Sequence, residues 1–200
     1  GSYLSELLLE KGYVVWGIVP KLVDIDKNIY KNFRVDLGKN VESYIIGATG
    51  CKLSHLEVIK IAQERGYENV LIFEDDFYMT DDFLMNLNDF IKKVKDLPRW
   101  DVLYLGGNNK SQEISNYCIP TKFDKVFRCK NVKCLHSYIV NRRLFPKVIE
   151  DLKTYGGEVD NYYMEILQPE YNAYIYNPIL VKQEPSFSNI VNKDVNYFKK

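Results

Sequence analysis

Apolar segments in the first half of the chain alternate between helical spacing and short continuous runs, and this alternation restricts the fold more than any other feature. Residues 4–11 and 50–66 have helical spacing, whereas residues 13–19, 69–73 and 101–105 are apolar runs of strand length. Alternating helices and buried strands predict an α/β fold, with a single Rossmann-type mixed sheet that is mainly parallel and flanked by helices. Ligands of such sheets bind beyond the carboxyl ends of the strands.

The other expected elements are less regular. Thr80 is a natural N-cap for a helix that ends before Pro98, and residues 141–153 predict another helix. Residues 21–46 and 109–125 are polar or irregular and are expected to be connections. The remaining predicted elements are strands at residues 126–128, 135–140 and 171–181 and a short helix at residues 160–167.

The composition limits the classes of protein to which this chain can belong. The 200 residues carry no net charge and are 46% hydrophobic, so a sizeable core is expected but no basic field for nucleic acid or anionic membrane. We expect one domain over residues 3–200, because Gly1-Ser2 is typical of a cloning remnant. No apolar run is long enough for a membrane span, and localisation stays open. The four cysteines form no CxxC pair, which argues against zinc and permits disulfides.

The strand at residues 69–73 runs directly into three carboxylates, Glu74, Asp75 and Asp76. Adjacent carboxylates repel one another, and a hard divalent cation such as Mg²⁺ or Mn²⁺ relieves that repulsion. If strand geometry persists through the triplet, Glu74 and Asp76 lie on one side and Asp75 on the other. The triplet suits a metal and sugar site, and it equally suits a solvated acidic turn.

Three further segments carry candidate groups, each with a structural alternative. Gly50 is expected to precede a helix whose free N–H groups favour anions, with Ser54 and His55 close to a phosphate or sugar; the alternative is an ordinary capped helix. Gly106-Gly107 could face a substrate or only reverse the chain. Asp160 could be a base or an N-cap. The sequence contains no GxxxxGK[ST], GxGxxG or GxSxG motif.

Taken in order, these segments resemble glycosyltransferase family 25, which includes lipooligosaccharide galactosyltransferases and collagen hydroxylysine galactosyltransferases. The resemblance depends on shared order and spacing, since each segment is common on its own. The matching stretches are residues 50–55, 69–76, 101–107, 136–143, 159–160 and 178–183, with the serines at 186 and 188.

The resemblance implies a GT-A-like fold and transfer of a sugar from a UDP-sugar, often with Mn²⁺, to a hydroxyl of a glycan or protein. It implies that Asp76 contacts the metal and that Glu74 and Asp75 serve the metal or the ribose. Ser54 and His55 would lie near the donor, and His136 would approach the metal or diphosphate.

The family is regarded as inverting, which implies direct displacement with a carboxylate base. Asp160 is the first candidate for this base and Asp101 the second. Members usually open with a strand and an Arg-containing segment, whereas this chain starts at what reads as the following helix, so that strand is missing, diverged or supplied otherwise. The alternatives are a non-catalytic binding or scaffolding domain of the same fold, and a nucleotidyltransferase that would release pyrophosphate.

Overall fold

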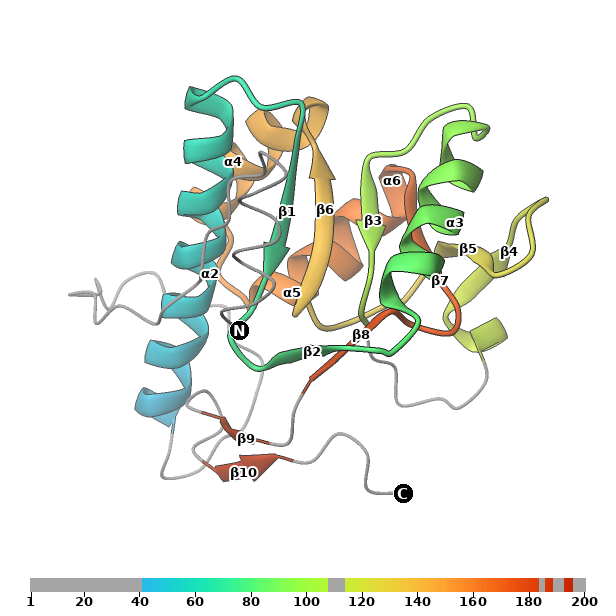
Figure 1. Cartoon of the computed structure of the whole chain (residues 1–200). Coiled ribbons are helices and arrows are strands. Elements are labelled where there is room, and N and C mark those ends of the chain that lie inside the picture. Colours follow the sequence, from blue (N-terminus) through green and yellow to red (C-terminus); the bar gives the residue numbers. More distant parts are fainter. Residues whose placement is uncertain (1–40, 108–113, 184–185, 189–192, 196–200) are drawn as a thin grey trace.

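The computed structural model describes residues 41–107, 114–183, 186–188 and 193–195. The helix and strand expected at residues 4–11 and 13–19, and Asn108, lie outside these described residues. The fold is mixed α/β, as predicted: a six-stranded sheet stands between helices on its two faces (Figure 1). In spatial order, the sheet consists of β1 (Asn69–Phe73), β6 (Ser137–Asn141), β3 (Val102–Tyr104), β7 (Ala173–Tyr176), β5 (Val126–Cys129) and β4 (Cys118–Pro120).

The expectation of a mainly parallel sheet was wrong. Among the described strands only β3 and β7 pair in parallel, and every other neighbour in this sheet is antiparallel. Two of these antiparallel pairs arise because β6 inserts between β1 and β3 and enters from the end where those two strands stop, and the other two belong to the β4–β5 hairpin and its contact with β7. β1 and β3 still run in the same direction, as two strands joined by a helical crossover must.

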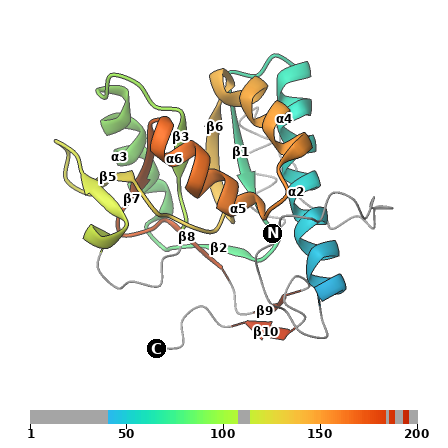
Figure 2. The same cartoon turned by 180° about the vertical axis from the view of Figure 1, so that it is seen from behind.

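Helices cover the two faces unequally. One face packs against α3 (Phe83–Lys95), which connects β1 to β3 through the short strand β2 (Phe77–Met79). Figure 2 shows the other face, where several helical elements pack together. These are α2 (Val41–Glu64), α4 (Phe145–Thr154), α5 (Val159–Tyr162), its π-helical continuation (Tyr163–Leu167) and α6 (Gln168–Glu170).

Short elements complete the described chain. β2 pairs with β8 (Val181–Gln183) in a small sheet below the main one, and β9 (Ser186–Ser188) pairs with β10 (Lys193–Val195). Two single 3₁₀ turns, Ile114–Asn116 and Arg142–Leu144, precede β4 and α4. The segment expected to be a loop at residues 109–125 therefore contains the first strand of the β4–β5 hairpin.

Strand side chains alternate between two cores. Val70 and Ile72 of β1 pack towards α2 and α4, whereas Phe73 packs towards α3. In β3, Tyr104 joins the first core and Leu103 the second, and both are fully buried. Period-two alternation with both faces apolar explains why these strands appear in the sequence as continuous hydrophobic runs.

α2 begins nine residues before the predicted start at Gly50, within the segment expected to be a connection. Ala48 and Thr49 are almost completely buried, and this burial outweighs the weak helix propensity of glycine. Gly50 therefore lies inside the helix and offers no free N–H groups to an anion, so that expectation was wrong.

The prediction that Thr80 caps the helix ending before Pro98 was also wrong. α3 begins at Phe83 with Asp82 in the capping position and no side-chain cap. The Thr80 hydroxyl instead donates to the carbonyl of Leu180 at 3.1 Å, which joins the end of β2 to the chain entering β8. Pairing of β2 with β8 thus takes Thr80 away from the helix.

No helix of the described part of the chain is long and apolar enough to cross a membrane.

Two glycines give a matched test of this packing. An added Cβ at Gly106 would lie 2.0 Å from His136 Nε2 and 2.6 Å from the Val181 carbonyl oxygen, whereas one at Gly50 would meet nothing within 4 Å. We expect Gly106→Ala to lower the free energy of unfolding by about 1–3 kcal/mol through overpacking. Gly50→Ala should leave it unchanged or raise it by up to about 1 kcal/mol. Denaturant unfolding measures both, and equal effects would contradict this packing.

Candidate functional site

The acidic triplet lies where β1 ends and β6 begins. Phe73 is paired with Ser137, and the next backbone bond runs from Glu74 N to the carbonyl oxygen of His136 at 3.0 Å. Glu74 and Asp76 are partly buried, while Asp75 is exposed. The chain folds this way because β6 runs opposite to β1, so the start of one strand meets the end of the other.

The side chain of Gln183 connects the two inward carboxylates. Its Nε2 lies 3.4 Å from Glu74 Oε2 and 3.2 Å from Asp76 Oδ2. The β2–β8 ladder places it there, because Phe77 pairs with Gln183. Glu74 and Asp76 thus converge on one hydrogen-bond donor, although β1 ends at Phe73 and the triplet continues as a turn rather than as a strand.

The charge on Asp76 has no cationic partner in the described contacts. Burial raises the pKa of its carboxyl first, and the charges of Glu74 and Asp75 raise it further. The hydrogen bond from Gln183 lowers it, but a neutral amide compensates only part of the repulsion. This arrangement fits a divalent cation, whose charge would stabilise both carboxylates at once.

His55 holds the other oxygen of Glu74. Its Nε2 lies 3.3 Å from Glu74 Oε1, and its Nδ1 lies 2.6 Å from the hydroxyl of Tyr138. All of this occurs inside the fold, since His55 and Tyr138 are fully buried. The carboxylate of Glu74 can only accept, so Nε2 of His55 donates to it, and both ring nitrogens have a hydrogen-bond partner. Tyr138 therefore orients His55, and His55 orients Glu74.

One turn before His55 on α2, Cys51 completes a second group of possible ligands. Ligand atoms of Cys51, His55 and Glu74 all lie within 4.8 Å of one another. Burial raises the pKa of the Cys51 thiol well above its ordinary value, and nearby carboxylates, Glu74 foremost, raise it further. Without a cation, the thiol therefore stays protonated. The carboxylate oxygens are better suited than the Cys51 sulfur to bind a divalent ion.

His136 is almost completely buried beside this group. Its Nε2 lies 3.2 Å from the Val181 carbonyl oxygen, to which it donates, and its Nδ1 has no hydrogen-bond partner among the described residues. Burial lowers the pKa of this imidazole, although Val181 and Glu74 act in the opposite direction. A neutral ring with a free lone pair on Nδ1 fits the predicted metal contact. Gly106 presses against the ring and leaves no space for a side chain.

Asp160 lies in the first turn of α5. Backbone N–H groups hold its carboxylate, with Asn161 N at 2.9 Å from Oδ1 and Cys134 N as a second donor. Burial raises the pKa of Asp160, while Lys133 and these hydrogen bonds lower it. Burial raises the pKa of the Cys134 thiol to about 12, together with the charges of Asp160, Glu74 and Asp76. Glu74 N donates to the carbonyl of His136, two residues after Cys134, so Asp160 and Glu74 both contact the connection that leads into β6.

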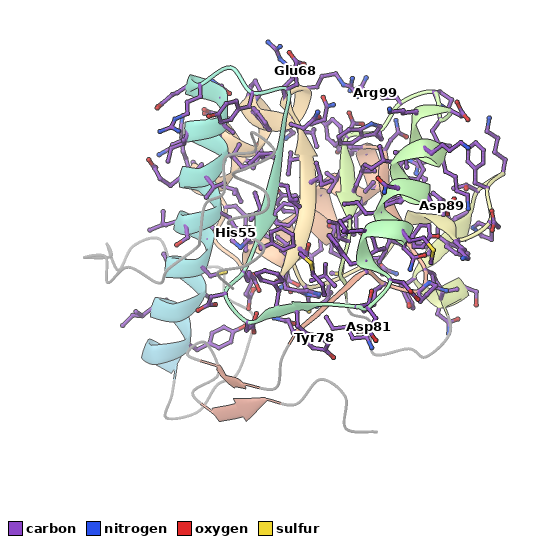
Figure 3. All side chains as sticks on the ribbon, viewed as in Figure 1. His55, Glu68, Tyr78, Asp81, Asp89 and Arg99 are labelled. Carbon is purple, nitrogen blue, oxygen red and sulfur yellow. The ribbon has the colours of Figure 1, made fainter. Side chains whose placement is uncertain are left out.

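Asp101 lies at the other end of the sheet. It precedes β3, whose far end leads to Gly106, and its carboxylate is 1% exposed. Arg99 Nε and Arg143 Nη2 lie 3.0 and 3.3 Å from its Oδ1. In Figure 3, Arg99 lies at the upper end of the sheet, and Tyr78, just after the acidic triplet, lies at the lower end. The structure therefore gives Asp101 a role in stability and does not bring it to the site.

Two other predicted residues have local roles. The Ser54 hydroxyl donates to the Gly50 carbonyl within α2 at 3.0 Å, so it is already engaged. A Cβ at Gly107 would lie 2.6 Å from Val132, so close packing requires a glycine there.

The sequence did not predict the roles of Tyr138 and Gln183 at this site. No local signal could reveal Gln183, because its partners are more than 100 residues away in the sequence.

A family model described as "Glycosyltransferase family 25 (LPS biosynthesis protein)" matches residues 28–164. The family match includes the quoted segments from residues 50–55 to 159–160, whereas residues 178–183 and the serines at 186 and 188 lie outside it. A curated mouse (Mus musculus) protein, "Inactive glycosyltransferase 25 family member 3", is 30% identical over 105 residues. That match covers 48% of this chain and only 18% of the mouse protein.

A solved structure gives a weaker likeness. The mannose-1-phosphate geranyltransferase from Thermus thermophilus is 13% identical, with a TM-score of 0.39 over 62% of this chain and 49% of that chain. A likeness of this extent carries no functional argument.

The repulsion at Asp76 makes stability depend on pH. Its folded-state pKa is raised, so the ionised form disfavours folding above that pKa, and the cost disappears as pH falls through it. We expect Asp76→Asn to increase the free energy of unfolding at pH 7 with chelator present. The gain should vanish in acid, where Asp76 of the parent protein is protonated. Denaturant unfolding across pH measures this, with exposed Asp75→Asn as a control of smaller effect.

The structural role of Asp101 predicts a different outcome. Asp101→Asn removes the charge that faces Arg99 and Arg143, and we expect a loss of about 2–4 kcal/mol in the free energy of unfolding. Exposed Asp81→Asn should change it by less than about 0.5 kcal/mol. An Asp101→Asn protein of parental stability that failed only in catalysis would restore Asp101 as a base.

Proposed function

Since this chain belongs to glycosyltransferase family 25, we propose that it transfers a sugar from a nucleoside diphosphate, a UDP-sugar by preference, to a hydroxyl of a glycan or protein acceptor, with inversion. The observation that supports this most is the convergence of Glu74 and Asp76 on Gln183, with Asp160 beside the same connection into β6 that Glu74 contacts. GT-A-like donor binding at the carboxyl ends of β1 and β3 agrees with this position. The domain proposed for this activity extends over residues 3–200.

Metal binding would use side chains at the acidic triplet that have no cationic partner among the described contacts. Asp76 and Glu74 would hold Mn²⁺ or Mg²⁺, and Nδ1 of His136 is a third candidate ligand. When bound, the ion supplies positive charge to the departing diphosphate. His55 and Tyr138 fix the carboxylate of Glu74 from behind, so little side-chain entropy is lost when a ligand arrives.

Catalysis would rest on Asp160. The acceptor oxygen attacks the anomeric carbon as the bond from that carbon to the diphosphate oxygen breaks, and the Asp160 carboxylate takes the acceptor proton. A pKa raised by burial brings this base closer to neutral pH, which favours proton transfer. The two backbone N–H donors keep the carboxylate in one orientation. Close positioning of donor and acceptor supplies much of the remaining rate.

A second candidate is a non-catalytic domain that binds without turnover. The name of the mouse relative, an inactive member of the family, favours it. This second candidate predicts that a sugar nucleotide stabilises the folded protein but that no sugar is transferred. Measured release of UDP, with or without acceptor, would exclude it, while pyrophosphate release would indicate a nucleotidyltransferase.

The binding proposal predicts a thermal shift. Mn²⁺ with a UDP-sugar should raise the melting temperature, because a ligand present at 100 times its Kd adds about 2.7 kcal/mol to the folded state. Asp76→Ala should abolish the shift, whereas Asp81→Ala, exposed near the same end of the sheet, should retain it (Figure 3). Absence of stabilisation by every sugar nucleotide, with and without metal, would refute the proposal.

Catalysis is tested separately. Asp160→Asn should keep the thermal shift but lower the transfer rate by about 10²–10⁴-fold, because it removes the base while preserving shape. Transfer at the parental rate would exclude Asp160 as the base.

A further inference from the structure

Two thiols face one another across the hairpin at the edge of the sheet. In the β4–β5 ladder, Cys118 is the register partner of Cys129. β4 is the edge strand and pairs with β5 alone. Their side chains are both 2% exposed and pack on the same side, against the core beneath α2 and α4.

The backbone bonds around this pair define its geometry. Lys130 N donates to the Tyr117 carbonyl at 2.9 Å, and Thr121 N donates to the Val126 carbonyl at 3.3 Å. Pairs 117–130 and 121–126 are thus hydrogen-bonded, so in an antiparallel ladder pair 118–129 is a non-hydrogen-bonded one. The Cα atoms of such a pair are about 4.5 Å apart, inside the window of about 4.4–6.8 Å that a disulfide requires.

The thiols already interact. Burial raises the pKa of the Cys129 thiol well above its usual value, and a hydrogen bond with Cys118 raises it further. The other two cysteines have no such partner position, since Cys51 lies on α2 and Cys134 lies in the connection between β5 and β6. All four are free thiols in this structure.

We propose that Cys118 and Cys129 are a redox site that closes to a cross-strand disulfide on exchange with an oxidised small-molecule disulfide such as oxidised glutathione. One thiolate attacks the external disulfide and releases one thiol, and the second thiolate then displaces the other. The external disulfide gains two electrons and becomes two thiols, while the chain loses two hydrogens and gains one S–S bond. Opening of β4 alone exposes both sulfurs, because no described strand covers its outer edge.

The bond would fix the edge hairpin. It would join the chain that arrives from Gly107 to the chain that continues towards His136, the two connections that lead to and from the candidate site. Closing so short a loop restricts the unfolded chain, and we expect the melting temperature to rise by roughly 5 °C.

Peptide mapping tests the proposal on the whole chain. The protein is treated with glutathione buffers of rising oxidised fraction, both folded and during refolding from denaturant, then alkylated, digested with trypsin and analysed by mass spectrometry. Trypsin cleaves after Lys122, Lys125 and Arg128, so the disulfide yields two peptides joined through Cys118 and Cys129. We expect this species in at least the refolding arm, with Cys51 and Cys134 alkylated.

Variants provide the control. The oxidised parent and Cys134→Ala should both show the rise in melting temperature over their reduced forms, and Cys129→Ala should not. Four alkylated cysteines in both arms would overturn the proposal, as would glutathione adducts on Cys118 or Cys129 alone, or equal linkage to Cys51 or Cys134.

Discussion

The ladder between β1 and β6 is the interaction on which the candidate site depends. Five residue pairs join the strands, from Asn69 with Asn141 to Phe73 with Ser137, and the bond from Glu74 to His136 extends them. β6 can insert only in the antiparallel sense, because it enters from the end at which β1 and β3 stop. One constraint of chain direction therefore brings an acidic strand end and a buried histidine together, although they lie far apart in the sequence.

The carboxylates at the two ends of the sheet have different kinds of partner. At the amino ends of β1 and β3, Asp101 is buried against two arginines, so its charge is neutralised within the chain. At the carboxyl ends, the described side-chain contacts of Glu74 and Asp76 are with the imidazole of His55 and the amide of Gln183, and no lysine or arginine is among them. Such carboxylates cost stability unless a cation joins them. This asymmetry supports a structural role for Asp101 and the proposal that ligand binds at the opposite end of the sheet.

Local pattern was enough to predict the class of fold and the elements that carry the acidic groups. β1 was predicted at its observed bounds, because an apolar run buried on both faces has a plain signature. The direction of β6, the early start of α2 and the position of Gln183 were not predictable in this way. Each depends on pairing or packing between distant segments, and such contacts override local propensity at Gly50 and Thr80. The acidic pair was found because its signal is local, while its supports, Tyr138 and Gln183, were not.

In the proposed function, donor binding and catalysis use different parts of this fold. The carboxylates proposed to hold the metal and diphosphate are fixed by β1, β8 and α2, whereas the proposed base belongs to α5 and is fixed by its own helix turn and by Cys134. A change in α5 can therefore remove proton transfer while the acidic pair still binds. Membership of a family thus does not determine activity, and an inactive relative is compatible with an intact donor site. In the proposed function, turnover depends on Asp160 and donor binding depends on Glu74 and Asp76.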